Sequence, residues 1–308
     1  MSGVPDPAGS GQAVGVTGAF SYSGAAVADE LVRRGRRVRT LTGHPGRAPH
    51  GTPVEVAPLD FTDLAGLRRS LTGVEVLYNT YWVRFPHPGT PFDAAVDNSR
   101  LLFEAAADAG VRRIVHVSIT NPDPDSPYPY FRGKALVEQH LRDTGVPHAV
   151  VRPAFFYGRR CVLMNNIAWL LRHLPLVAVG DGGSYRVRGM HVDDLARLCA
   201  DLGERDDDVV VDGVGPDRPT FRELVEQIRD AVAPRRPILD LPGRLFEPLT
   251  GVLGTVLRDR LLTRDEYRAM ATGLADSEAP ATGSMGFGDW LAGEADTLGR
   301  HYLNDTRS

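Results

Sequence analysis

The chain has 308 residues, of which 42% are hydrophobic and 24% charged, with a formal net charge of −4. This composition is ordinary for a globular protein of one or two domains. The slight acidity argues against nucleic acid as a partner, because a duplex binder needs a clustered basic face. Cys161 and Cys199 lie far apart in the sequence, so we expect no disulfide framework and no metal centre.

The first segment, "MSGVPDPAGSGQ", is rich in glycine, proline and serine and has no apolar run of signal-peptide length. We therefore expect residues 1–11 to be a disordered tail and the protein to be cytoplasmic. No run of 18 apolar residues appears, so we expect no membrane span and no membrane partner.

Apolar patterning predicts strands that alternate with helices from residue 12 to residue 153. The expected strands are 12–18, 36–43, 54–60, 74–80, 111–119 and 147–153, and the expected helices are 24–35, 62–71, 92–110 and 130–145. Short runs rich in valine and isoleucine are typical of strands covered on both faces. The alternation predicts an α/β, Rossmann-type, doubly wound parallel sheet.

After residue 153 the predicted strands and helices no longer alternate regularly. We expect helices at 163–175, 193–202 and 221–232, strands at 185–192 and 208–214, and a mostly helical tail from residue 242. These elements predict a smaller, mixed C-terminal region at 154–308, which we expect to bind substrate. We expect segments such as 185–213 to return to the first domain, at 12–153.

The first strand–helix junction carries a glycine-rich turn. Gly18, Ser21 and Gly24 occupy the positions of a GxxGxxG motif between a strand and a helix. The first glycine permits a tight turn, and the last lets the helix start close to a diphosphate, which then faces free backbone amides. Ser21 replaces the middle glycine, and its hydroxyl is a candidate donor to phosphate. The pattern predicts a dinucleotide site; the alternative is a plain turn with incidental glycines.

The adenosine end of this predicted site lacks an acid. NAD-binding sheets usually end the second strand with Asp or Glu, which holds the ribose hydroxyls. Here Thr42 is followed by His44 and Arg47. A cation suits a 2′-phosphate, so NADP is favoured over NAD; the alternative for Arg47 is a solvated loop charge. Asp60 is a candidate acceptor for the adenine amino group, or else a helix cap.

Several stretches resemble one known family. "TGAFSYSG" at 17–24, Leu59-Asp60, "VDNSRLLFEAAADAGVRRIVHVS" at 96–118 and "YFRGK" at 130–134 resemble an extended-type short-chain dehydrogenase/reductase. More narrowly, residues 12–202 are similar to its atypical branch, which includes NmrA-like proteins and an accessory subunit of respiratory complex I. That branch contains both enzymes and redox-silent binders.

The resemblance implies a catalytic pair. Tyr130 and Lys134 form a YxxxK motif, whose spacing places both on one helix face. In the family this tyrosine is the general acid/base, and the lysine holds the nicotinamide ribose. A nearby ammonium also lowers the pKa of a phenol from its usual value of about 10. The alternative is an interfacial tyrosine beside a solvated lysine.

A hydroxyl usually completes this set. The family ends its fifth strand with two small hydroxyl residues, the second of which polarises the substrate. Here Ile119 occupies that second place, so Ser118 or Thr120 is the candidate. Strand alternation puts these two on one face and Ile119 on the other.

The remaining candidates follow the carboxyl ends of strands, where open α/β sheets bind ligands. The resemblance adds as cofactor contacts Phe20, Tyr22, Phe61, Asn79, Thr80, Pro153, Ala154 and Phe155. Candidates for the substrate pocket are Tyr81, Trp82, Phe85 and Asn165. The alternative for the aromatic residues among them is that they cover the sheet edge.

These observations predict an NAD(P)-dependent oxidoreductase or epimerase that acts on a small organic carbonyl or alcohol. The alternative is a redox-silent NAD(P)-binding sensor or assembly protein. The expected partner is a small-molecule substrate, and the sequence leaves a homo-oligomer open.

Overall fold

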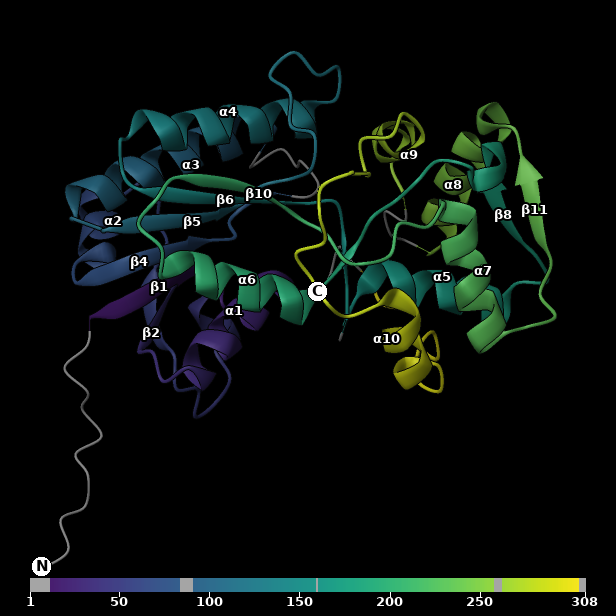
Figure 1. The fold of residues 1–308 in the computed structure, drawn as a ribbon, viewed down its shortest axis with the longest axis horizontal. Helices are drawn as coiled ribbons and strands as arrows, with labels where there is room; N and C mark the ends of the chain where they lie inside the picture. Colours follow the sequence, from purple (N-terminus) through teal and green to yellow (C-terminus); the bar gives the residue numbers. More distant parts are fainter. Residues whose placement is uncertain (1–11, 84–90, 159, 258–261, 305–308) are drawn as a thin grey trace, which may run out of the picture. The chain divides into compact units, whose positions relative to one another are not determined.

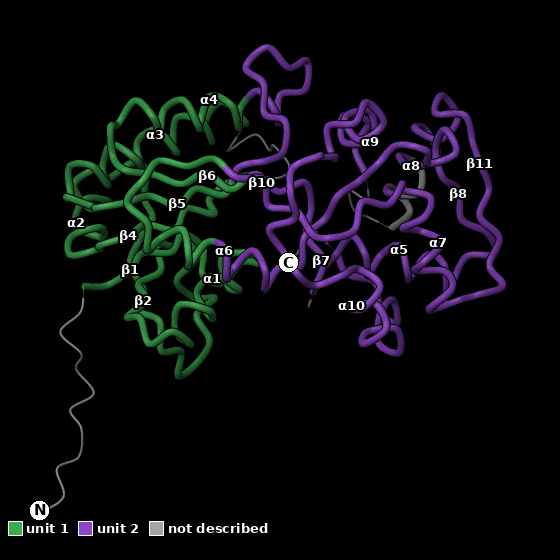
Figure 2. The backbone as a smooth tube through the Cα atoms, viewed as in Figure 1, with its two compact units in different colours: residues 1–117, 133–151, 199–210 green, residues 118–132, 152–198, 211–308 purple. Residues whose placement is uncertain are grey.

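The computed structural model describes residues 12–83, 91–158, 160–257 and 262–304 (Figure 1). The chain divides into two compact units (Figure 2). Unit 1 comprises residues 1–117, 133–151 and 199–210, and unit 2 comprises residues 118–132, 152–198 and 211–308.

A seven-stranded sheet has the order β10-β6-β5-β4-β1-β2-β3. Its strands are β1 (Ala13–Thr17), β2 (Val38–Thr42), β3 (Glu55–Pro58), β4 (Val74–Asn79), β5 (Arg113–Val117), β6 (His148–Pro153) and β10 (Val209–Gly213). The neighbouring pairs from β3 to β6 are parallel. The strand order grows outward from β1 in both directions, which confirms the predicted Rossmann-type sheet.

Four helices connect the strands of this sheet. They are α1 (Tyr22–Arg33), α2 (Leu64–Leu71), α3 (Phe92–Asp108) and α4 (Pro129–Asp143), and a 3₁₀ turn, η1 (Pro45–Arg47), follows β2. Figure 1 shows α3 and α4 on one face of the sheet and α1 on the other. Leu77, Ile114 and Val150 of the strands form a buried core with Phe103 of α3 and Leu141 of α4. Burial of these large apolar side chains stabilises the sheet that carries the site.

The strands of unit 2 are only two to four residues long. Its strands are β7 (Phe156–Tyr157), β8 (Val177–Gly180), β9 (Met190–His191) and β11 (Ile238–Leu241). Its helices are α5 (Val162–His173), η2 (Asp181–Gly183), α7 (Phe221–Val232), α8 (Gly243–Leu257), α9 (Arg264–Ala271) and α10 (Phe287–Glu294), and α6 (Val192–Gly203) begins in it.

Unit 2 contains two small parallel strand pairs, β7 with β9 and β8 with β11, and most of the strand expected at 185–192 is absent. Only Met190–His191 of that stretch is strand, and Arg186 makes an isolated bridge to Thr220. Two- to four-residue strands are too short to show a period, so the sequence pattern does not predict them. In the described part of the chain, no helix combines the length and apolarity needed to cross a membrane.

Candidate functional site

The glycine-rich turn joins β1 to α1 at the carboxyl edge of the sheet. Gly18 has a φ of +66°, a conformation that favours glycine, whereas Ser21 has an ordinary φ of −93°. The backbone N–H and the hydroxyl of Ser21 both donate to the Gly18 carbonyl, at 2.8 and 2.7 Å. Serine therefore fits the middle position without strain, and its hydroxyl closes the turn on itself.

Gly24 is essential to the shape of this turn. A Cβ added there would lie 2.2 Å from the carbonyl oxygen of Gly18, so no larger residue fits. The turn is also tied to β2, because Gly18 N–H donates to Leu41 O and Ala19 N–H donates to the Thr40 hydroxyl, each at 3.0 Å. A tight, anchored turn at a helix start presents backbone amides to an anion, so these residues fit a diphosphate.

The residues expected at the adenosine end lie at the end of β2 and in the segments that follow β2 and β3. Thr42 is buried and its hydroxyl accepts from His44 N–H at 3.0 Å, while Arg47 is exposed on η1. Asp60 is exposed and accepts from the N–H and hydroxyl of Thr62, at 2.8 and 2.7 Å. These two bonds lower the pKa of Asp60 below its usual value. Asp60 therefore closes a local turn before α2, whose N-cap is Asp63 rather than Asp60 or Thr62.

Phe61, which follows β3, packs against Tyr81, which follows β4, with ring centroids 5.0 Å apart. Tyr81 accepts a hydrogen bond from Asn98 Nδ2 at 2.9 Å, and burial raises the pKa of its hydroxyl. Phe20 and Tyr22 flank Ser21 and are half-buried. Trp82 stacks on Phe92 with centroids 5.9 Å apart, and Phe85 lies outside the described residues.

Lys134 is the best-defined candidate in unit 1. It is only 3% exposed, and its Nζ donates to the Val117 carbonyl at 2.9 Å. The ammonium also lies 4.7 Å from the ring centroid of Trp82, within the range of a cation–π contact. Burial lowers the pKa of Lys134 to about 7, against which the carboxylate of Glu138 acts.

Lys134 is also the only lysine in the sequence, and every other residue among the 35 lysines and arginines is arginine. Arginine stays charged at all ordinary pH values, whereas a buried lysine is able to lose its proton near neutrality. The chain therefore places its one titratable amine side chain at the buried end of β5. A side chain that loses and gains a proton near neutral pH is suited to a proton-transfer site.

The single lysine permits a direct test of its pKa. We expect ¹³C-labelled lysine to give one side-chain resonance that titrates near pH 7 in the folded protein. Because the unfolded state binds this proton more tightly, Lys134 makes the free energy of unfolding rise with pH between about 7 and its usual 10.5. We therefore expect Lys134→Met to be more stable than the parent, with the largest difference in the free energy of unfolding below about pH 7. A resonance that titrates at the ordinary value would contradict the burial argument.

The other catalytic candidates lie in unit 2. Tyr130 is half-buried in the first turn of α4, and its ring lies 5.9 Å from that of Phe131. Ser118 is 4% exposed and Thr120 is 1% exposed. The Thr120 hydroxyl donates to the Leu274 carbonyl at 2.9 Å, so its proton is already used within the fold.

The remaining candidates of unit 2 are Asn165, Pro153, Ala154 and Phe155. Asn165 was expected in a substrate pocket, but its Nδ2 donates to the His301 carbonyl at 2.8 Å and its Oδ1 accepts from Gly299 N–H at 3.0 Å. This side chain therefore holds the end of the chain in place. Pro153 ends β6 and is buried, while Ala154 and Phe155 are half-buried beside it. The Phe155 ring lies so close to Gly189 that a Cβ there would come within 2.4 Å of it.

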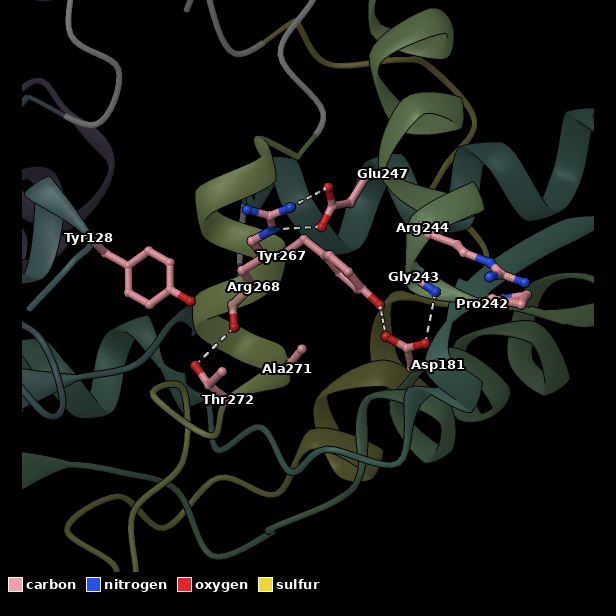
Figure 3. Close-up of a pocket in the computed structure, with 10 residues that line it drawn as sticks. All are labelled: Tyr128, Asp181, Pro242, Gly243, Arg244, Glu247, Tyr267, Arg268, Ala271 and Thr272. Carbon is pink, nitrogen blue, oxygen red and sulfur yellow. Dashed lines mark hydrogen bonds and ion pairs between the residues drawn. The ribbon is translucent and has the colours of Figure 1, made fainter.

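Sequence reasoning missed a pocket of about 460 Å³ in unit 2 (Figure 3). Its lining residues are Tyr128, Asp181, Pro242, Gly243, Arg244, Glu247, Tyr267, Arg268, Ala271 and Thr272. They come from separate parts of the sequence and share no period or motif, so no sequence signal marks them.

Hydrogen bonds organise the acidic groups of this pocket. Asp181 accepts from the Tyr267 hydroxyl at 2.6 Å and from Gly243 N–H at 2.7 Å, which lowers its pKa. Asp181 also has a φ of +48°, uncommon outside glycine. Arg268 pairs with both carboxylate oxygens of Glu247, at 2.7 and 3.1 Å. Figure 3 shows these two clusters side by side, with Tyr128 at the other end of the pocket.

The parallel sheet and its glycine-rich turn have the form of a dinucleotide-binding Rossmann domain. Residues 18–160 match the family model described as NAD(P)H-binding. The chain therefore carries an NAD(P)-binding domain with homologues in the atypical short-chain dehydrogenase/reductase, NmrA-like and complex I subunit families, which confirms the resemblance seen in the sequence.

Among its relatives is the mitochondrial NADH-ubiquinone oxidoreductase 40 kDa subunit of Neurospora crassa. The two are 24% identical over 314 residues, which cover 97% of this chain and 80% of the relative. The (4-alkanoyl-5-oxo-2,5-dihydrofuran-3-yl)methyl phosphate reductase of Streptomyces griseus is 35% identical over 156 residues, 50% of this chain and 49% of the reductase.

Among solved structures, triphenylmethane reductase of Citrobacter sp. in complex with NADP(H) has the same fold. The TM-score is 0.73 at 19% identity, over 92% of this chain and 99% of the reductase. At this identity the match establishes the fold alone.

Proposed function

We propose that this protein is an NADP-dependent oxidoreductase that acts on a small organic carbonyl or alcohol, with Tyr130 as its general acid/base. The observation that carries the proposal is the placement of the only lysine, Lys134, in a buried position four residues after Tyr130 on α4. Reductases among the relatives and structural neighbours support the reaction class.

In the reductive direction the cofactor and each of these residues have separate roles. NADPH, when bound, supplies the hydride that the substrate carbon receives. Tyr130 donates its hydroxyl proton to the carbonyl oxygen and regains a proton from solvent. Lys134, when charged, favours the phenolate that Tyr130 leaves behind and so lowers the cost of this transfer. Ser118 orients the same oxygen through its hydroxyl.

Fluorescence titration of the purified chain with NADPH and NADH tests the cofactor part of this proposal. We expect saturable binding of both, with NADPH bound more tightly. A screen of aldehydes, ketones and quinones should then show NADPH oxidation for a subset of them. The proposal fails if neither dinucleotide binds at millimolar concentration.

We expect Arg47→Ala to weaken NADPH binding by about tenfold and to leave NADH binding unchanged. Arg47 is exposed on η1 directly after β2, where its guanidinium is suited to a 2′-phosphate. Arg69→Ala, which removes an exposed arginine paired with Asp63, serves as the matched control. Equal loss of affinity for both dinucleotides would exclude 2′-phosphate recognition by Arg47.

A second candidate function is that of a redox-silent NAD(P)-binding protein. Two observations favour it: the Thr120 hydroxyl is used by Leu274, and Ile119 stands where the family has a hydroxyl residue. The similarity to the Neurospora crassa subunit supports it as well. This alternative predicts saturable NADPH binding without hydride transfer to any compound of the screen.

A further inference from the structure

Three buried side chains form a hydrogen-bonded row across neighbouring strands of unit 1. Thr17 ends β1, Asn79 ends β4, and His116 lies opposite Asn79 in the register of β5. All three are 0% exposed. The Thr17 Oγ1 lies 3.0 Å from Asn79 Oδ1, and Asn79 Nδ2 lies 3.0 Å from His116 Nδ1. The row therefore runs from the strand before the phosphate turn to the strand before α4.

The backbone after β4 fixes the direction of this row. The N–H groups of Thr80 and Tyr81 approach Thr17 Oγ1 at 2.8 and 3.0 Å, and Tyr81 N–H also approaches Asn79 Oδ1 at 3.1 Å. A backbone N–H only donates, so both of these oxygens accept. The hydroxyl proton of Thr17 is then donated to Asn79 Oδ1. The amide of Asn79 consequently turns its Nδ2 toward His116.

This direction determines the protonation state of His116. Because Asn79 Nδ2 only donates, His116 Nδ1 must accept, so the imidazole is neutral and carries its proton on Nε2. Burial, and the nearby charges of Lys134 and His148, hold the pKa of His116 well below its usual value. Nε2 has no hydrogen-bond partner among the residues that the structure describes, and the ring meets Phe103 edge-on at 5.7 Å.

We propose that neutral His116 is a positioning residue for the dinucleotide site: it orients Asn79, which holds Thr17 and the backbone of Thr80 and Tyr81 in place. The Thr80 hydroxyl completes the connection by donating to the Thr17 carbonyl at 2.7 Å. Thr80 and Tyr81 follow β4 at the edge where open α/β sheets bind nucleotides, beside the turn after β1. The proposal rests on the proposed function only for the identity of the ligand.

The tautomer is measurable without any ligand. In the full chain labelled with ¹⁵N-histidine, the shifts of the two ring nitrogens distinguish the neutral tautomers and the imidazolium. His116→Asn assigns the resonances. We expect a proton on Nε2 and none on Nδ1 at about pH 8, unchanged at about pH 6 although an ordinary histidine titrates between them. A proton on Nδ1 at either pH would overturn the proposal.

Asn79→Asp tests whether the row is connected. A carboxylate still accepts from Thr17 and Tyr81 but no longer donates, so His116 must now donate from Nδ1. We expect the proton to move to Nδ1, either as the other neutral tautomer or as the imidazolium. Unchanged nitrogen shifts in this variant would show that Asn79 does not set the state of His116.

NADPH affinity tests the positioning role. His116→Asn places Oδ1 where Nδ1 was and removes the unpartnered Nε2, so we expect its Kd to stay within about twofold of the parent. His116→Leu leaves Asn79 Nδ2 without an acceptor, and we expect a Kd about tenfold weaker. Equal affinity of the two variants would overturn the role, and should His116→Leu fail to fold, Asn79→Asp provides the comparison. Absence of NADPH binding in the parent would instead refute the proposed function and leave the tautomer result standing.

Discussion

Tyr130→Phe is expected to lower the rate of NADPH-dependent carbonyl reduction by a hundredfold or more while the Kd for NADPH changes little. A positioned general acid typically contributes a factor of about 10²–10⁴, and phenylalanine keeps the ring while it removes the proton that is transferred. Tyr130 is half-buried at the start of α4, so loss of one hydroxyl leaves the helix intact. The measurement is the steady-state rate with the best substrate of the carbonyl screen.

Tyr185→Phe is the matched control, because it also removes a single phenol hydroxyl. The Tyr185 hydroxyl is buried without a hydrogen-bond partner in the described part of the chain, and the ring stacks on Phe221 at 5.6 Å. We expect this variant to retain the parent rate and to be at least as stable. Equal rates for Tyr130→Phe and the parent would exclude Tyr130 as the proton donor and favour the redox-silent alternative if no other donor is found.

The sheet could be predicted because its signals are local. Each strand and helix from residue 12 to residue 153 carries its own apolar period, and alternation of the two permits few topologies. The small strands of unit 2 depend on partners far along the chain: Ile238 of β11 pairs with Val177 of β8. No local pattern encodes such a pairing, so those elements were missed.

The phosphate turn shows where a motif stops being informative. Gly18 and Gly24 identify it, but the spacing does not say which residue takes the positive φ. The structure assigns +66° to Gly18 and −93° to Ser21, which explains why serine is accommodated in the middle. A motif therefore predicts the presence of a turn better than the role of each position in it.

The roles of polar side chains are harder to predict, because their hydrogen-bond partners lie far away in the sequence. Thr120 was expected to orient a substrate, yet its hydroxyl donates to Leu274, and Asn165 holds His301. The sequence predicts Asn79 beside a cofactor and does not reveal that its amide is shared between Thr17 and His116. Each residue type is equally suited to catalysis and to bracing the fold, and only the three-dimensional neighbours decide between the two.

Gly24→Ala is expected to open the phosphate turn and weaken NADPH binding. The added Cβ would lie 2.2 Å from the Gly18 carbonyl oxygen and 2.8 Å from its carbon, and both are backbone atoms of the same turn. Neither atom is able to move without opening the turn, so α1 must shift away from β1. We expect NADPH affinity to fall by about a hundredfold and the free energy of unfolding by about 1–3 kcal/mol.

Gly293→Ala separates this effect from the general cost of replacing a glycine. Gly293 is exposed near the end of α10, and a Cβ there meets no atom within 4 Å. Because alanine favours a helix over glycine, we expect this control to gain up to about 1 kcal/mol of stability and to bind NADPH as the parent does. If Gly24→Ala also binds NADPH with parental affinity while circular dichroism shows a folded sheet, the diphosphate is not held at this turn. The buried lysine would then have to be explained without a dinucleotide beside it.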